Sequence, residues 1–279
     1  MTDATINAVL RRDRTIVLSA IVAITALAWA YVLWLAANMD MAMGAVMGSS
    51  VGESMDKTMS GIGAMLKPAF RPWNVVDFTY LFVMWAVMMV GMMMPSVASM
   101  VLLYANVGRK AAENGRPLAA TGWFVAGYLL AWTAFSLAAT VAQWQFSRLA
   151  LITPMMSSAS DLFGGLLLIA AGLYQWSPLK DACLTHCQSP LGFLISRGGF
   201  KASLWGSLRL GAEHGSLCVG CCWVLMALLF VGGVMNLLWI AGLTIFVLLE
   251  KIIPTGRLVP RLAGAAMAAA GLFLLYRAY

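Results

Sequence analysis

The sequence has few charged residues. Asp, Glu, Lys and Arg make up 10% of its 279 residues, whereas soluble domains usually contain about 25%. Hydrophobic residues make up 62%, and long apolar runs recur along the chain. This composition excludes an ordinary soluble domain and predicts an all-α, polytopic transmembrane helical bundle surrounded by membrane lipid.

The chain also lacks the motifs of common enzyme classes. It has no phosphate-binding loop, no dinucleotide fingerprint and no carboxylates paired for hydrolysis. We therefore expect no catalytic residue and no organic cofactor. The net charge of +7 does not indicate nucleic-acid binding, because excess Lys and Arg in a membrane protein mostly mark cytoplasmic loops.

Seven apolar segments are candidates for membrane-spanning helices. They are residues 16–37, 78–104, 118–141, 162–176, 215–234, 237–249 and 258–276. The fourth and sixth are shorter than the ~20 residues that a helix needs to cross, so we predict six or seven spans. Gly232, Gly233 and Asn236 are expected to separate the fifth segment from the sixth. We treat residues 1–279 as a single transmembrane domain.

The distribution of basic residues predicts the orientation. With the N-terminus inside, the inner loops hold twelve Lys and Arg residues: Arg11, Arg12, Arg14, Arg109, Lys110, Arg116, Lys180, Arg197, Lys201, Lys251, Arg257 and Arg261. The outer segments hold five: Lys57, Lys67, Arg71, Arg148 and Arg277. The first apolar segment has no clear cleavage site, so we interpret it as a retained helix. The expected location is a bacterial inner membrane, multi-pass, with a cytoplasmic N-terminus.

Cysteine and histidine are scarce and lie in one window. All five cysteines and both histidines belong to it: Cys183, His186, Cys187, His214, Cys218, Cys221 and Cys222. An odd number of clustered cysteines argues against a disulfide scaffold and favours metal or redox chemistry. Thiolate and imidazole suit soft ions, so copper(I) is the favoured metal and zinc(II) the alternative.

Both groups of ligands are predicted to lie on helix faces. Ser177 and Pro178 form a good helix start and Pro190 a stop, so the first three ligands share one face of a short helix. At 100° per residue, His214, Cys218 and Cys221 fall within about 60° of one another, and Cys222 widens this stripe to about 100°.

We therefore expect residues 177–214 to form a cytoplasmic-side Cys/His loop with an interfacial helix. The second group would be a ladder of ligands that runs from His214, at the inner end of a span, into the bundle. Seven ligands exceed the needs of one four-coordinate ion. Either two ions bind, or ligands exchange along a path, as a transporter or chaperone requires.

Two other interpretations of the cysteines stay open. Cysteine is small and packs well between membrane helices, so the cluster can be structural. Alternatively, Cys183 with Cys187, or Cys218 with Cys221, can form a reversible redox pair.

Methionine is abundant, with 20 residues. Seven of them lie in residues 38–74, an expected methionine-rich outer loop: Met39, Met41, Met43, Met47, Met55, Met59 and Met65. Met84, Met88 and Met92, at i, i+4 and i+8, form a stripe along the second span. Thioethers select copper(I), so these three are candidate secondary ligands, although methionine stripes at helical spacing usually fill a core.

Ionisable residues near the spans are interpreted as anchors. Arg209 and Glu213, at i and i+4, are expected to pair just before the fifth span. Glu250 lies at the end of the sixth segment, where a charge costs little.

Three stretches carry a resemblance to a known family. They are Met84-Trp85 with Met88 to Ser96; Leu173 to Gln175 with Pro178 to Lys180, Cys183 to Cys187 and Ser189-Pro190; and His214-Gly215 with Cys218 to Trp223. These motifs resemble a bacterial domain-of-unknown-function family described as predicted metal-binding integral membrane proteins. The resemblance covers roughly residues 75–254. It implies a membrane location and a metal site at the cysteines and histidines.

The leading hypothesis is an integral membrane protein that binds copper(I) and acts in metal transport, delivery or copper-enzyme assembly. Its partners would be the metal ion and a membrane metalloenzyme or metal chaperone. A membrane thiol-disulfide oxidoreductase is the first alternative. A structural subunit of a larger membrane enzyme complex is the second.

Overall fold

A computed structural model describes residues 3–49, 75–114, 121–152, 158, 160–253 and 257–279. Its helices are α1 (Asp3–Ser49), α3 (Val75–Glu113), α4 (Thr121–Arg148), α5 (Asp161–Gln175), α6 (Pro178–Gln188), α7 (Pro190–Ser196), α8 (Leu204–Ala227), α9 (Leu229–Gly232), α10 (Leu237–Ile252) and α11 (Leu258–Ala278). In these ranges no β-strand forms, and Ile152 and Ser158 make one isolated bridge. The predicted all-α class is confirmed.

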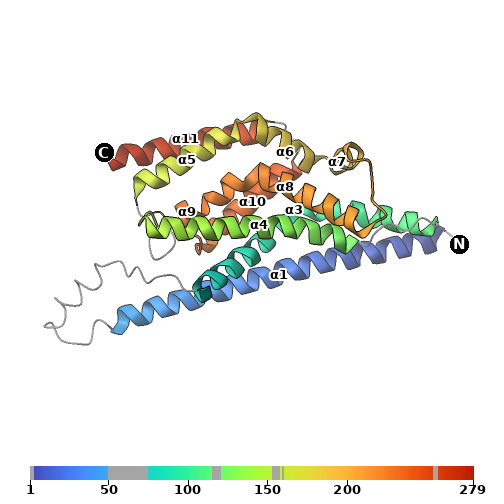
Figure 1. The fold of residues 1–279 in the computed structure, drawn as a ribbon, viewed down its shortest axis with the longest axis horizontal. Helices are drawn as coiled ribbons and strands as arrows, with labels where there is room; N and C mark the ends of the chain where they lie inside the picture. Colours follow the sequence, from blue (N-terminus) through green and yellow to red (C-terminus); the bar gives the residue numbers. More distant parts are fainter. Residues whose placement is uncertain (1–2, 50–74, 115–120, 153–157, 159, 254–256) are drawn as a thin grey trace.

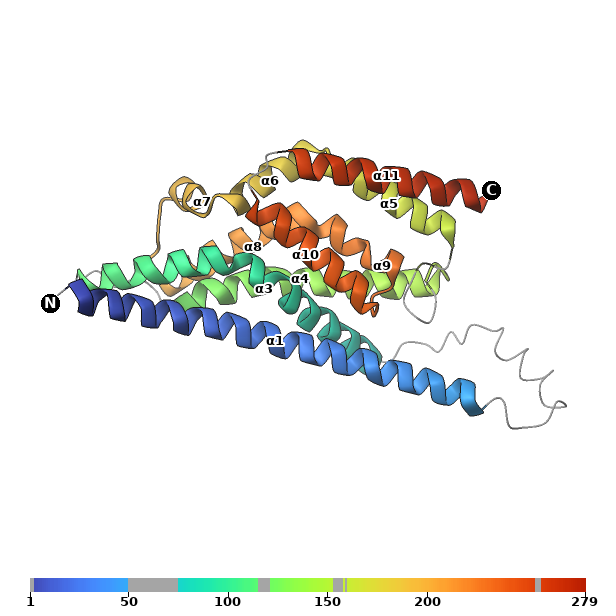
Figure 2. The same ribbon diagram turned by 180° about the vertical axis from the view of Figure 1, so that it is seen from behind.

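The helices form three groups that lie beside one another (Figure 1). Helices α3, α4, α8 and α10 occupy the middle. The long helix α1 runs along α3 on one side, and α5 and α11 lie together on the opposite side, which Figure 2 shows from behind. Helix α6 continues from the end of α5 and rests on α8. The two helices that carry the cysteines, α6 and α8, are therefore in direct contact.

Five helices of the described ranges are long and apolar enough to cross a membrane. A sixth candidate arises when α5 and α6, which meet at a 65° bend, are counted as one broken span. The sequence predicts six or seven spans and the structure has five or six candidates, so a count of six agrees with both. Helix α10 has 16 residues, in line with the short sixth segment of the sequence.

The break between the fifth and sixth segments is confirmed. Helix α9 ends at Gly232, and Gly233 adopts a φ of 95°, a backbone conformation that favours glycine. The side chain of Asn236 then caps α10 by accepting a hydrogen bond from the Trp239 amide at 3.2 Å.

The helix that contains the fifth apolar segment begins earlier than the sequence indicates. Helix α8 starts at Leu204, where the Ser203 hydroxyl accepts a hydrogen bond from the Gly206 amide at 3.1 Å. The apolar run marks only the later part of this helix, because its first turns carry polar residues. His214 therefore lies in the middle of α8 and not at its entrance.

Glycine allows α8 to pack unusually close to α4. A methyl group added at Gly211 would collide with the Phe124 carbonyl, and one added at Gly127 would collide with the Leu208 carbonyl. Small residues let helix backbones approach in this way. The contact fixes the depth and rotation of α8, and with them the positions of its cysteines.

The methionines of the second span lie in the core. Met84, Met88 and Met92 are at most 2% exposed and belong to the main hydrophobic cluster. Core packing accounts for this burial, and their role as thioether ligands stays a prediction. Most of the methionine-rich segment 38–74 lies outside the described residues, apart from the end of α1.

Candidate metal centre

Helix α6 begins and ends where the sequence predicts. The Ser177 hydroxyl accepts a hydrogen bond from the Lys180 amide at 3.1 Å, and Pro178 occupies the first turn. The helix closes at Gln188, before Pro190 starts α7. Cys183 is buried, and Cys187 is partly buried.

The four ligand candidates on α8 are all buried. His214, Cys218, Cys221 and Cys222 are between 1% and 4% exposed. The thiols of Cys221 and Cys222 both donate to the Cys218 carbonyl, at 3.1 and 2.9 Å. The predicted stripe of ligands on this helix therefore faces the interior of the bundle.

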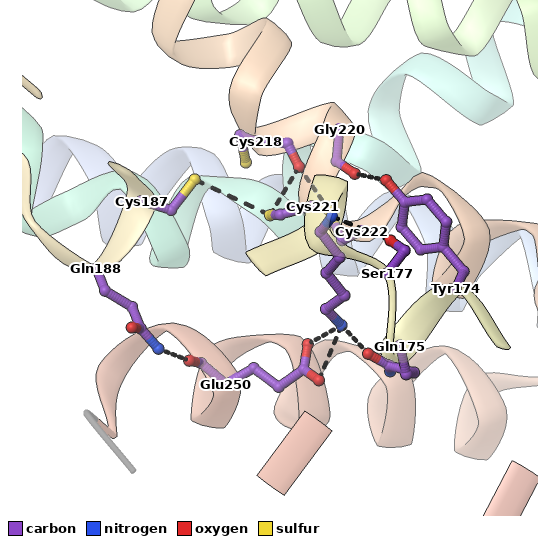
Figure 3. Close-up of polar contacts among 11 residues, drawn as sticks. Tyr174, Gln175, Ser177, Cys187, Gln188, Cys218, Gly220, Cys221, Cys222 and Glu250 are labelled. Carbon is purple, nitrogen blue, oxygen red and sulfur yellow. Dashed lines mark hydrogen bonds and ion pairs between the residues drawn. The ribbon is translucent and has the colours of Figure 1, made fainter. Parts of the chain in front are cut away.

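The thiols of the two helices meet across the α6–α8 contact. Figure 3 shows Cys187 pointing toward Cys221, and their sulfur atoms are 3.9 Å apart. Cys183 lies against the α8 backbone, where a methyl group added at Gly220 would be 2.9 Å from its sulfur. The Tyr174 hydroxyl, at the end of α5, donates to the Gly220 carbonyl. Two sequence-distant cysteine groups thus form one cluster.

Cys218 has polar partners from two further helices. The Lys251 ammonium of α10 donates to the Cys218 sulfur at 2.9 Å and to the Ser96 hydroxyl at 3.1 Å. The Tyr128 hydroxyl lies 3.1 Å from the same sulfur and donates to the Met93 carbonyl at 3.2 Å. The thiolate is the form of cysteine that binds metals, and the buried ammonium is placed to balance its charge.

The rings of both histidines lie near Phe193. The His214 ring is 4.9 Å from the Phe193 ring, and the half-buried His186 ring is 6.4 Å from it. Among the described residues, Nδ1 of His214 is buried and has no hydrogen-bond partner. A buried polar atom without a protein partner is often bound to an ion or a water molecule.

A small pocket joins these groups. It is lined by Ser96, Val97, Ser99, Met100, Tyr128, Cys187, His214, Cys218 and Lys251. A common space is therefore surrounded by Cys187 of α6 and by His214 and Cys218 of α8.

The spacing of the sulfurs suits a shared metal ion. Two thiolates that bind zinc at about 2.3 Å are about 3.8 Å apart at a tetrahedral angle and about 4.6 Å apart when collinear. The 3.9 Å between Cys187 and Cys221 falls within this range. Across the residues that the structure describes, however, no three His, Cys, Asp or Glu side chains are arranged to hold a metal ion. The described residues therefore bring two thiols close together, without a third ligand arranged beside them.

Three charged residues are more buried than their positions in the sequence indicate. Lys180 and Lys251 are expected in inner loops and Glu250 at the end of a span, where water would be near. Glu250 does lie in the last turn of α10, but the exposed fractions of Lys180, Lys251 and Glu250 are 0%, 8% and 3%. The Lys180 ammonium donates to both Glu250 carboxylate oxygens, at 2.9 and 2.8 Å. A charged side chain is usually exposed to solvent, but here opposite charges from two helices form a buried pair. An ionisable pair directly after an apolar helix was the available signal.

The expected surface pair is confirmed. Arg209 and Glu213 form an ion pair of 3.0 Å on the outside of α8. Glu213 also pairs with Arg197, beyond α7, at 3.0 Å. These contacts help to hold α7 and its Phe193 beside His214.

Comparison with known proteins identifies the family. Residues 82–274 match the model of the PpoB2 family, described as a copper chaperone, and this match covers more than half of the 279-residue chain. The chain belongs to the PpoB2 copper chaperone family. The matched stretch contains α4 to α10 complete, and so includes every cysteine and histidine of the candidate site. No curated protein and no solved structure matches the chain.

Proposed function

We propose that this PpoB2 family protein is a membrane copper chaperone. It holds one copper(I) ion that is bound by the thiolates of both Cys187 and Cys221. The metal is its cargo. Cys183, Cys218, Cys222 and His214 are the ligands that take over the ion as it enters or leaves. His186, whose ring lies 6.4 Å from the Phe193 ring, is a further candidate ligand. The acceptor is a membrane metalloenzyme or a second metal chaperone.

The observation that carries the proposal is the 3.9 Å contact between the Cys187 and Cys221 sulfurs. The two residues come from different helices, so the site opens when α6 and α8 separate. A carrier needs such a site, because a cargo held by few ligands can pass to an acceptor by ligand exchange. A structural zinc ion is instead enclosed by four ligands, and zinc sites of that kind are closed.

The chemistry of the donor atoms supports copper(I) as the bound metal. Thiolate sulfur favours copper(I), and the cysteines of the cluster are buried apart from the partly buried Cys187. The family description also names copper. The helices that are long enough to cross a bilayer support a membrane location, where an enzyme could receive the metal during assembly.

Comparison of two metals tests this proposal. We expect the anaerobic, reduced protein in detergent to bind copper(I) at least about 100-fold more tightly than zinc(II), because zinc favours four protein ligands or three with water. Competition with a chromophoric copper(I) chelator and with a fluorescent zinc chelator gives the two affinities. Equal affinities, or tighter zinc binding, would contradict a copper carrier.

A second function is favoured by the same contact. Two thiols at 3.9 Å on different helices can also form a reversible disulfide, which would make the protein a membrane thiol-disulfide oxidoreductase. The pair would then be Cys187 with Cys221, between helices, and not either of the pairs within one helix. Turnover of a dithiol substrate in the absence of copper would favour this second function.

A further inference from the structure

Helix α6 is attached to α10 at both of its ends, and both attachments use Glu250. Near the start of α6, the Lys180 ammonium donates to the two carboxylate oxygens of Glu250. In its last turn, the Gln188 side chain donates to the Glu250 backbone carbonyl at 2.7 Å. Figure 3 shows the contact between Gln188 and Glu250 in the same view as Cys187 and Cys221. The side-chain oxygen Oε1 of Gln175, at the end of α5, also accepts from the Lys180 ammonium.

Apolar burial contributes little to the docking of α6. Its buried residues are Lys180, Cys183 and Leu184, so only one of them is aliphatic. Leu179, on the same short helix, is 60% exposed. The side chains of the ion pair are 1% and 2% exposed, so water does not weaken the attraction as it does for a surface pair. The buried polar contacts with Glu250 therefore supplement the packing of α6 against α8 in setting where α6 lies.

Helix α10 connects the two cysteine helices through adjacent residues. Glu250 binds Lys180 of α6, and Lys251 binds Cys218 of α8. On α6, Lys180 and Cys187 are seven residues apart, which is about two turns and nearly the same face of a helix. A movement of Lys180 away from Glu250 would therefore carry Cys187 away from α8.

We infer that the buried Lys180–Glu250 ion pair is a positioning device that sets Cys187 opposite Cys221. Neither residue binds the metal. Together they hold α6 in the one arrangement in which the thiols of the two helices meet. The effect of this arrangement on copper affinity rests on the proposed function. Its effect on the positions of the thiols is independent of the proposed function.

The test measures the thiols and the copper separately. In copper-free protein, the rate of Cys187–Cys221 cross-linking by a small-molecule disulfide reports their proximity. Glu250→Gln is expected to slow cross-linking at least about tenfold, because removing one partner of a buried pair leaves an uncompensated charge. Lys180→Met combined with Glu250→Gln leaves no unpaired charge. This double variant is expected to keep the melting temperature of the wild type and still cross-link slowly.

The matched control is Asp181→Asn. Asp181 also lies on α6 and forms an ion pair, with Arg257 at 2.9 Å, but Arg257 is 65% exposed. Exposed pairs contribute little, so cross-linking should change less than about fivefold. Wild-type cross-linking in the folded double variant would overturn the inference, whatever the copper affinity. Slow cross-linking with wild-type copper affinity would support the positioning role and contradict the proposed copper pair.

Discussion

Replacing Cys187 by serine is expected to weaken copper(I) binding at least about 100-fold, since loss of even an outer-shell partner costs roughly 10–100-fold in metal affinity. The hydroxyl is a hard donor that soft ions avoid. Cys221→Ser should have an effect of the same size, because each thiolate is half of the site. Competition with a copper(I) chelator under anaerobic conditions measures both variants.

Cys222→Ser is the matched control for these variants. Its thiol donates to the Cys218 carbonyl at 2.9 Å, and a serine hydroxyl can make the same bond. Cys222 is proposed to bind the ion only during its transfer, so we expect the equilibrium affinity to change by less than about tenfold, below the loss of Cys187 or Cys221. An equal loss of copper(I) affinity in all three variants would indicate a larger shared cluster and contradict the two-sulfur site. Wild-type affinity in Cys187→Ser would contradict the proposed function.

Oxidation of the copper-free protein is expected to abolish copper(I) binding by joining Cys187 to Cys221. Each thiol loses a proton, and the pair loses two electrons, which reduce the added small-molecule disulfide to two thiols. The sulfurs start 3.9 Å apart and must reach about 2.05 Å, a change within the range of side-chain rotation. Peptide mapping identifies the bond, and a chelator assay measures the remaining affinity.

Two comparisons sharpen this experiment. Protein loaded with copper(I) beforehand should resist oxidation, because the metal occupies both sulfurs. Cys183→Ser should still form the bond, since Cys183 lies against Gly220 and not in the pair. A disulfide between Cys218 and Cys221, or full copper binding by the oxidised protein, would contradict the expected result.

Local signals in the sequence predict much of the fold. The serine and proline at the start of α6, Pro190 after its end, and Gly233 with Asn236 before α10 all act within a few residues. Their effects can therefore be read without knowledge of tertiary structure. The same holds for the buried stripe on α8, which follows from helical periodicity alone.

Contacts between helices could not be predicted in this way. The sequence favours thiol pairs within one helix, such as Cys183 with Cys187, because only those spacings are visible. The contact between Cys187 and Cys221 depends on the 65° bend between α5 and α6 and on the close packing of α8 against α4. Likewise, the burial of Lys180 depends on Glu250, which is 70 residues away in the chain.

X-ray absorption at the copper edge of the copper(I)-loaded protein tests the central claim most directly. The account predicts that copper has sulfur neighbours from Cys187 and Cys221, and that this sulfur signal disappears when both residues are replaced by serine. Nitrogen or oxygen neighbours in place of sulfur, or an unchanged sulfur signal in the double variant, would contradict it.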